Sequence, residues 1–272
     1  MKKILCPTDF SPTSYNAITY AAKLAQATNA DLTLLNVQSL FDITPVEFVT
    51  GKEFSIKATG ERLQAQCKEV SKVFKISCYA EVEPTYNKLS TVIRDRSHKF
   101  DLIVMGSNGA DDLYQFFLGS NTYNALAKAK KPVLLIPEGM LYSEIKKMVY
   151  AFDYLRERKL PLEPLLQFVR SVKCELTVLQ VMEEAYSKKA EEDLREMQFI
   201  LKSKHGDDLP FIYDTIRSSE VAKSIDSYIL QKQPDALALC SLHRNIIENL
   251  FHISIIRNIT AVCSYPVFVF HE

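Results

Sequence analysis

Four small residues in the first half of the sequence have a spacing suited to phosphate binding. Gly106 and Gly109 are three positions apart, and Gly119 and Ser120 follow after nine intervening residues. A glycine lets the backbone approach a ligand closely, because it has no Cβ and can adopt a positive φ. Free N–H groups in such loops and at the start of the following helix form a cradle for anions, to which Ser120 adds a hydroxyl donor. The spacing therefore predicts a phosphate-binding loop.

Strand-like and helix-like segments alternate along the first half of the chain. The expected strands are Lys3–Cys6, Leu32–Val37, Ile76–Val82, Leu102–Met105 and Val133–Ile136. The expected helices are Pro12–Thr28, Glu53–Phe74, Asn87–Lys99 and Asn121–Lys130. The first helix has clear start signals, since Ser11 can cap it and Pro12 suits its first position. This alternation predicts an open parallel sheet with helices on both faces.

The glycines and one acidic residue fall at the ends of predicted strands. Gly106 directly follows the strand Leu102–Met105, and Asp9 lies shortly after the strand Lys3–Cys6. In an open parallel sheet, ligands bind beyond the carboxyl ends of the strands, where the strand order reverses. We therefore expect Asp9 to face the same crevice as the glycines, where its carboxylate could accept hydrogen bonds from ribose hydroxyls.

The second half of the chain repeats the pattern of the first. A shift of 134 positions lays Asp101 over Asp235, and a shift of 144 positions lays Asp9 over Asp153. The second copy is therefore ten residues shorter between its first and fourth strands. We place the missing length after the second strand, around Phe41–Phe54 of the first copy.

The repeat defines two domains. The strands expected in the second copy are Met148–Phe152, Leu176–Val181, Phe211–Thr215, Ala236–Cys240 and Val267–Phe270. The segment Pro137–Ser143 is the natural linker. We predict domains at residues 1–140 and 141–272.

The glycine motif resembles the nucleotide signature of the universal stress protein family. That signature, G-x2-G-x9-G-[ST], is met in full by Gly106, Gly109, Gly119 and Ser120. The resemblance covers essentially the whole chain as a tandem pair of domains. It implies an α/β fold with two open parallel five-stranded sheets, Rossmann-like and similar to the adenine nucleotide alpha hydrolases, packed as an intramolecular pseudo-dimer.

The resemblance also implies a ligand, ATP, and a set of contacts. Asp9, in the segment Pro7–Ser11, is expected to hold the ribose, and Val37 at the end of the second strand to pack on the adenine. The first glycine pair and the Gly-Ser step are expected to hold the phosphates. The full set of expected binding residues is Pro7, Thr8, Asp9, Val37, Met105, Gly106, Ser107, Gly109, Gly119, Ser120 and Asn121.

One departure from the family pattern follows the second glycine. Many relatives have a basic residue there, whereas this chain has Asp111 and Asp112. These carboxylates either form a solvated turn or hold a cation, in which case Mg²⁺ would accompany the ATP. A second interpretation of the whole motif stays open: Gly106 and Gly109 only shape a turn, Asp9 only hydrogen-bonds its own loop, and the protein is a nucleotide-free interaction scaffold.

The second copy has lost the motif. The shift of 134 positions lays Cys240, His243 and Ile253 over the three glycines, and only Ser254 matches its counterpart. A β-branched residue is sterically unsuited to a place where the backbone must approach phosphate. We therefore predict one ATP site per chain and a second domain that pairs with the first.

The repeat also leads us to expect that the two domains pair with each other and that the protein binds a partner. Val133–Ile136 and Val267–Phe270 are the expected edge strands at the junction of the two domains, and further association into a homodimer stays open. An unknown protein partner could respond to ATP through the loop Ser107–Leu118, which contains several large apolar residues.

Composition excludes several classes of function. The 33 basic and 33 acidic residues cancel, so the chain lacks the basic footprint of a nucleic-acid-binding protein. No apolar run reaches the roughly 18–20 residues of a membrane helix, and the N-terminus does not read as a signal peptide. We expect a cytoplasmic protein. The six cysteines form no CxxC pair and are expected to be reduced residues of the core.

Enzymatic motifs are missing from the sequence. It contains no Walker A sequence, no G-x-G-x-x-G after a strand and no pyrophosphatase loop. No nucleophile has an evident base beside it. We expect a protein that is not an enzyme, with no metal site of its own, while slow hydrolysis of bound ATP stays open.

Overall fold

The chain folds into two compact units, Met1–Tyr142 and Ser143–Glu272, and the sequence had predicted a boundary at residue 140. The computed structural model describes residues 1–40, 52–107, 124–126, 128–152, 162–182, 192, 195–196, 198–199, 211–241 and 265–271. The predicted pairing of the two units stays a prediction, and each unit is considered by itself.

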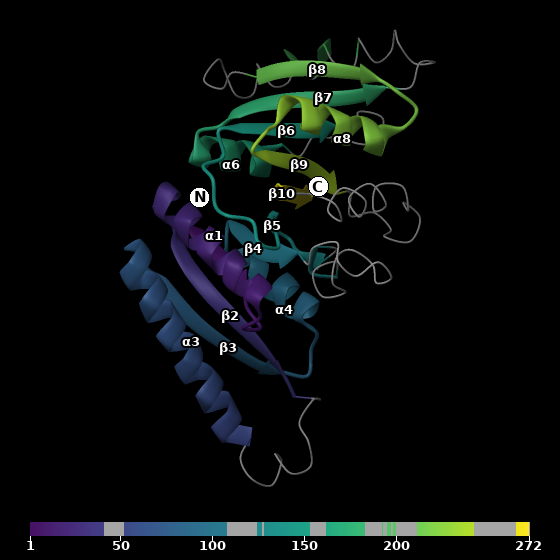
Figure 1. Cartoon of the computed structure of the whole chain (residues 1–272). Helices are drawn as coiled ribbons and strands as arrows, with labels where there is room; N and C mark the ends of the chain where they lie inside the picture. The colour runs from purple at the N-terminus through teal and green to yellow at the C-terminus, as the bar shows by residue number, and fades with distance from the viewer. Residues whose placement is uncertain are drawn as a thin grey trace. The chain divides into compact units, whose positions relative to one another are not determined.

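The first unit has five parallel strands in the order β3-β2-β1-β4-β5. Its elements are β1 Lys3–Pro7, α1 Pro12–Thr28, β2 Asp31–Ser39, α3 Lys52–Phe74, β3 Cys78–Thr85, α4 Leu89–Arg96, a 3-10 turn at Ser97–Lys99, β4 Leu102–Ser107 and β5 Val133–Pro137. Figure 1 shows α1 and α3 on one face of these strands and α4 on the other. Residues 124–126 and 128 are also helical.

The second unit has the same topology, with five parallel strands in the order β10-β9-β6-β7-β8. Its elements are β6 Lys147–Phe152, α6 Glu163–Val172, β7 Glu175–Met182, β8 Phe211–Arg217, α8 Val221–Lys232, β9 Ala236–Ser241 and β10 Val267–His271. In chain order α6 and α8 are the equivalents of α1 and α4. The predicted α/β fold, with five parallel strands in each copy, is confirmed.

All ten predicted strands are present, and the differences lie at their ends. The largest concerns β3, which was predicted at Ile76–Val82 and spans Cys78–Thr85. Its bounds follow its partner: Leu32 pairs with Cys78, and the ladder continues to Ser39 and Thr85. The last residues of β3 were missed because the ladder of β2 extends them past the apolar run.

An aspartate closes the amino-terminal edge of the sheet in each unit. Asp101 accepts hydrogen bonds at Oδ2 from the backbone N–H groups of Lys2 (2.6 Å) and Lys3 (3.0 Å). Asp235 does the same for Lys146 and Lys147, both at 2.8 Å. The residue that defined the 134-position repeat therefore has a structural role, since it joins the starts of the first and fourth strands.

The two units differ in the connection between their second and third strands. In the first unit Leu32 pairs with Cys78, and in the second Leu176 pairs with Phe211. The two connections span positions 32 to 78 and 176 to 211, so the second is shorter by 11 positions. The missing length predicted near Phe41–Phe54 therefore lies in the expected connection.

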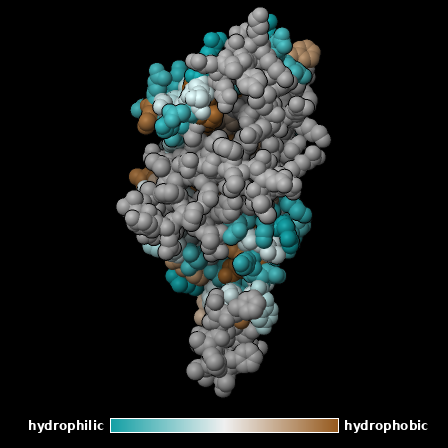
Figure 2. Space-filling view, turned by 90° about the vertical axis from the view of Figure 1, so that its right-hand side faces the viewer, coloured by the Kyte–Doolittle hydropathy of each residue, from teal (hydrophilic) through white to brown (hydrophobic). Residues whose placement is uncertain are grey.

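The coloured residues of the surface are mostly hydrophilic on the face that Figure 2 shows, with hydrophobic residues singly or in small groups between them. Among the described residues, the most exposed large hydrophobic side chains are Leu141, Leu230, Phe199 and Val73. Within the part of the chain that the structure describes, no helix has the length and apolar character needed to cross a membrane.

Candidate functional site

The strand order of the first unit reverses between β1 and β4. β1 pairs with β2 on one side and with β4 on the other, where Ile4 lies opposite Leu102. The chain leaves β1 through Pro7–Asp9 and leaves β4 through Gly106 and Ser107, so both segments lie at the carboxyl ends of neighbouring strands, where ligands of such sheets bind. The structure thus places Pro7, Thr8 and Asp9 at the same edge of the sheet as Met105, Gly106 and Ser107. Gly109, Gly119, Ser120 and Asn121 lie outside the described residues.

Asp9 begins a tight turn at this edge of the sheet. Its side chain is exposed, and Oδ1 accepts a hydrogen bond of 3.0 Å from the backbone N–H of Ser11. Partial desolvation acts to raise the pKa of Asp9, but hydrogen bonds from Ser11 and Ser14 outweigh it and hold the pKa below its ordinary value. The carboxylate is therefore charged at neutral pH and accepts hydrogen bonds only.

The N–H, the hydroxyl and the carbonyl of Thr8 all form hydrogen bonds that hold this turn. Its side chain is buried, its N–H donates to the carbonyl of Leu35 (2.9 Å), and its hydroxyl pairs with that of Ser14 (3.0 Å). Its carbonyl accepts a hydrogen bond of 2.8 Å from the Asn36 amide. Thr8 was predicted as a binding residue, and the structure places its side chain inside the scaffold that positions Asp9.

Phe10 adopts an unusual backbone conformation in the same turn. Its φ is +62°, a left-handed value that a residue with a Cβ adopts only when its surroundings enforce it. The guanidinium of Arg62, on α3, lies 4.0 Å from the centre of the Phe10 ring. This cation–π contact fixes the turn from the side of α3.

Gly106 is explained by a close contact with the first turn of α1. A Cβ at this position would lie 2.6 Å from Cγ2 of Thr13 and 2.9 Å from its carbonyl oxygen. Gly106 is also a regular member of β4, opposite Ile136, and it is not among the residues with positive φ. The positive φ expected from the sequence is therefore wrong for Gly106, and the space beside its Cα is filled by Thr13. The expected approach to phosphate stays a prediction.

The remaining predicted residues differ in how far they are buried. Val37 is half-buried on β2, two positions beyond the pairing of Leu35 with Pro7. Met105 is a buried core residue. Ser107 is also buried, and its hydroxyl donates to the carbonyl of Ile136 at 3.3 Å. Val37 and Asp9 are thus the described site residues whose side chains reach the surface.

Sequence reasoning missed the residues that position this edge. Thr13 packs on Gly106, Asn36 holds Thr8, and Arg62 covers Phe10. Asn36 carried a signal, since it is a polar residue within an apolar strand and a buried amide needs a partner. Thr13 and Arg62 carried none, because their contacts are set by how helices pack on the sheet.

The equivalent edge of the second unit is built differently. Cys240 is buried on β9 opposite Phe270, the position that Gly106 occupies opposite Ile136. Gln180, at the position of Asn36, is 5% exposed, and its Oε1 has no hydrogen-bond partner among the described residues. Asp153, His243, Ile253 and Ser254 lie outside the described part of the chain.

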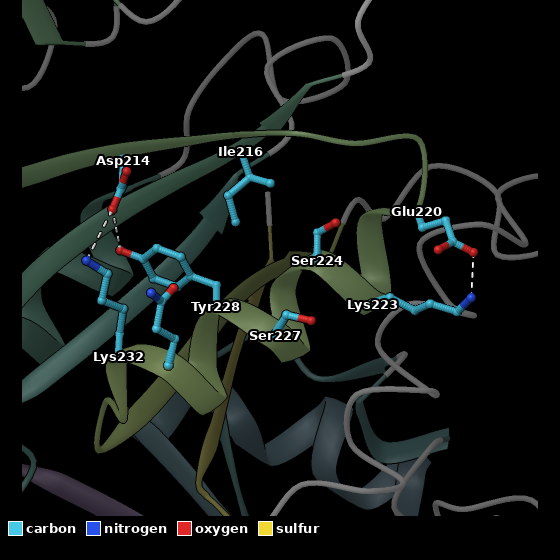
Figure 3. A pocket seen from close by; sticks show the side chains of 9 residues that line it. Asp214, Ile216, Glu220, Lys223, Ser224, Ser227, Tyr228 and Lys232 are labelled. Carbon is cyan, nitrogen blue, oxygen red and sulfur yellow. Dashed lines mark hydrogen bonds and ion pairs between the residues drawn. The ribbon is translucent and has the colours of Figure 1, made fainter.

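A groove of about 650 Å³ lies between β8 and α8 of the second unit. Figure 3 shows Tyr228 and Lys232 reaching from α8 to Asp214, with Ser224 and Ser227 between this group and an ion pair of Glu220 with Lys223. The Tyr228 hydroxyl donates to Asp214 at 2.9 Å. Burial and this hydrogen bond raise the pKa of Tyr228, so its hydroxyl stays protonated at neutral pH.

Comparisons with known proteins found a matching family model, a relative of similar sequence and solved structures of similar fold. The model of the universal stress protein family matches residues 1–137. The universal stress protein MJ0577 of Methanocaldococcus jannaschii is 27% identical over 154 residues, which is 50% of this chain and 94% of that protein. The crystal structure of a universal stress protein from Archaeoglobus fulgidus matches with a TM-score of 0.76 at 18% identity, over 99% of this chain and 98% of that chain.

A second solved structure extends the similarity of fold. It is a universal stress protein from Pseudomonas aeruginosa, with a TM-score of 0.64 at 15% identity, over 100% of this chain and 93% of that chain. At these identities the two structures support the fold alone. The residues that the family model matches belong to the first unit, which contains the switch point between β1 and β4.

Proposed function

Because this chain belongs to the universal stress protein family, we propose that its first unit binds ATP beyond the ends of β1 and β4 and thereby regulates a protein partner. One observation carries the proposal: the full nucleotide signature begins at the end of β4, at the switch point, beside the exposed Asp9. Ligands of open parallel sheets bind at this place. The proposed location is the cytoplasm.

The described residues fit the nucleoside part of ATP. The exposed, charged Asp9 supplies the acceptor that ribose hydroxyls need, and the turn that carries it is fixed by Thr8 and Phe10. The half-buried Val37 supplies an apolar wall for the adenine. Because Thr13 fills the space beside Gly106, we assign the phosphates to the backbone of Gly109 and Gly119 and to Ser120.

A divalent cation would extend the same site. Asp111 and Asp112 follow Gly109 directly, and carboxylates are ligands that Mg²⁺ prefers. We propose that they hold Mg²⁺ against the phosphates, which removes the repulsion between two carboxylates and a triphosphate. The protein is then a binding protein and not an enzyme, with any ATP hydrolysis slow.

The second unit, in this proposal, binds no ATP. Cys240 adds a side chain where the first unit has Gly106, and Ile253 stands at the place of Gly119. An interaction scaffold without a nucleotide is the second candidate function. It is favoured by one observation, the packing of Thr13 on Gly106, which explains this glycine without any ligand.

Identification of the nucleotide carried by the purified protein, followed by calorimetric titration with ATP, tests the proposal. We expect about one ATP per chain, with tighter binding in the presence of Mg²⁺. Gly119→Val should abolish binding, and Asp9→Ala should weaken it at least about tenfold because a charged acceptor is lost.

Matched controls come from the second copy. Ile253→Val and Asp153→Ala change the equivalent positions and should leave the affinity for ATP unchanged. No nucleotide in the purified protein and no heat at millimolar ATP would refute the proposal and leave the scaffold function. Two ATP per chain would refute the assignment to the first unit alone.

A further inference from the structure

Phe10 differs from the other described residues that combine a side chain with a left-handed backbone. The four others directly follow the last residue of a helix, where a left-handed residue is ordinary: Asn29 after α1, Lys75 after α3, Lys173 after α6 and Gln233 after α8. Phe10 instead lies between the end of β1 and the start of α1, with a φ of +62°. Contacts from its surroundings must therefore hold it in this conformation.

The conformation of Phe10 sets the position of the Asp9 carboxylate. The Phe10 N–H donates a hydrogen bond of 3.1 Å to the hydroxyl of Thr8, and the next N–H, that of Ser11, donates one of 3.0 Å to Oδ1 of Asp9. The second bond reaches back across Phe10, so its direction depends on the Phe10 backbone. Rotation of Phe10 to a negative φ would turn the Ser11 N–H away and release the carboxylate.

Arg62 supplies a contact that favours the left-handed form of Phe10. The half-buried Phe10 ring lies 4.0 Å from the guanidinium carbon of Arg62, whose side chain is otherwise exposed on α3. This distance is well within the range of a cation–π interaction. Because the contact is lost when the ring moves, it stabilises the observed turn relative to a relaxed one.

We propose that Arg62 is a positioning residue of the nucleotide site: by holding the Phe10 ring, it keeps the Asp9 carboxylate in place for the ribose hydroxyls. The inference rests on the proposed function, because it concerns the affinity of the first unit for ATP. Arg62 acts here through Phe10 and then through Asp9, without touching the nucleotide. A direct attraction between its positive charge and the phosphates is the other role that a cation could have, and the experiment separates the two.

Calorimetric titration of the full-length protein with two nucleotides tests the proposal. ATP is compared with 2′,3′-dideoxy-ATP, which has the same phosphates but lacks the ribose hydroxyls that Asp9 would bind. Arg62→Met keeps an apolar side chain beside the ring and removes the charge. We expect it to weaken ATP about two- to fivefold, the range of a cation–π contact at an exposed site, and to leave the affinity for the dideoxy nucleotide unchanged.

Three further variants show how Arg62 acts. Arg62→Lys keeps a cation that can lie over the ring, and it should bind ATP within about twofold of the parent. Phe10→Gly removes the ring and adopts a left-handed backbone without strain, so adding Arg62→Met to this variant should change its ATP affinity no further. Lys57→Met removes another exposed positive charge from α3 and should leave the affinity for ATP unchanged.

The outcomes distinguish a failure of this inference from a failure of the proposed function. If Asp9→Ala weakens ATP binding but Arg62→Met binds as tightly as the parent, the proposed function stands and this inference alone is overturned. An equal loss for both nucleotides also overturns it, since Arg62 would then act on the phosphates or on the fold. So does a loss of the same size in the Phe10→Gly background. A parent that binds neither nucleotide refutes the proposed function and this inference together.

Discussion

The two units share their amino-terminal edges and differ at their carboxyl-terminal edges. At the amino-terminal edge, Asp101 and Asp235 accept the same pair of backbone hydrogen bonds in each unit. At the other edge Gly106 is replaced by Cys240, and Asn36 by Gln180. The edge that joins strands is thus kept, while the edge where ligands bind varies. The two units have the same strand order despite the changes at the second edge.

The outer strands show a second difference. In the first unit, Arg96 of α4 bridges Glu81 and Glu83 of β3. In the second, Asp214 of β8 takes Tyr228 and Lys232 of α8 as partners, and Ile216 stands two positions further along. One guanidinium binds two carboxylates beside β3, whereas a tyrosine and a lysine share one carboxylate beside β8, where the groove lies.

The largest effect on stability is expected at position 106, where the residue of the second unit does not fit the first unit. Gly106→Cys, which places the second unit's residue in the first, should lower the free energy of unfolding by about 3 kcal/mol because the new Cβ meets Thr13 at 2.6 Å. Thr13→Ser in the same chain removes the nearest atom and should recover about 1 kcal/mol. Urea unfolding measures both, and a Gly106→Cys variant as stable as the parent would contradict the steric explanation.

Replacing the two buried amides, Asn36 and Gln180, should change the stability of the fold in different directions. Asn36→Leu leaves the buried carbonyl of Thr8 without its 2.8 Å partner and should cost about 2 kcal/mol. Gln180→Leu removes an amide oxygen that has no partner among the described residues, and it should be neutral or stabilise by up to about 1 kcal/mol. Thermal unfolding of the two variants separates the signs, and equal losses would show that Gln180 is paired.

The aspartates at the shared edge should behave alike. Asp101→Ala and Asp235→Ala each remove the acceptor of two backbone N–H groups, and each should cost about 1–2 kcal/mol. A large difference between the two variants in chemical unfolding would show that the repeat does not use these residues equally.

Asp101 also predicts a dependence on pH. Desolvation acts to raise its pKa, but hydrogen bonds from Lys2 and Lys3 and nearby positive charge lower it overall. Because the folded pKa lies below the unfolded one, the stabilisation is complete above pH about 4 and is lost as pH falls through the folded pKa. The stability difference between the parent and Asp101→Asn should shrink in that window, and a constant difference would contradict this.

The smallest effects are expected at the outer strands. Arg96→Met and Tyr228→Phe should each cost about 0.5–1 kcal/mol, since both groups are partly exposed. Salt at 1 M should reduce the cost of Arg96→Met more than that of Tyr228→Phe, because an ion pair is screened more than a hydrogen bond from a neutral hydroxyl. Unfolding with and without added salt provides the comparison.

Local patterns were sufficient to predict most of the fold. The Ser11 and Pro12 signals gave the start of α1, and Ser11 caps it by accepting a hydrogen bond from the N–H of Ser14 at 3.2 Å. The third strand was predicted two residues too early and three too short, because β2 and not its own composition fixes its extent. The connection with the missing length followed from the repeat alone.

The candidate site was predicted only in part. The side chains of Asp9 and Val37 reach the surface, while Thr8 and Ser107 have their hydroxyls bonded within the scaffold. The prediction could not distinguish these cases, because a residue at the end of a strand can turn toward a ligand or toward the sheet. The glycines after position 107 lie outside the described residues, and their role stays a prediction.

The sequence by itself determined the strands and helices of each unit and their repeat, because hydrophobic periodicity and turn residues act over short distances along the chain. Only the tertiary structure decided why position 106 is glycine and what holds Phe10 in its strained turn. Each of these depends on residues from different elements, such as Thr13 on Gly106 and Arg62 on Phe10. Contacts of this kind arise from helix packing on the sheet, which no spacing along the chain encodes.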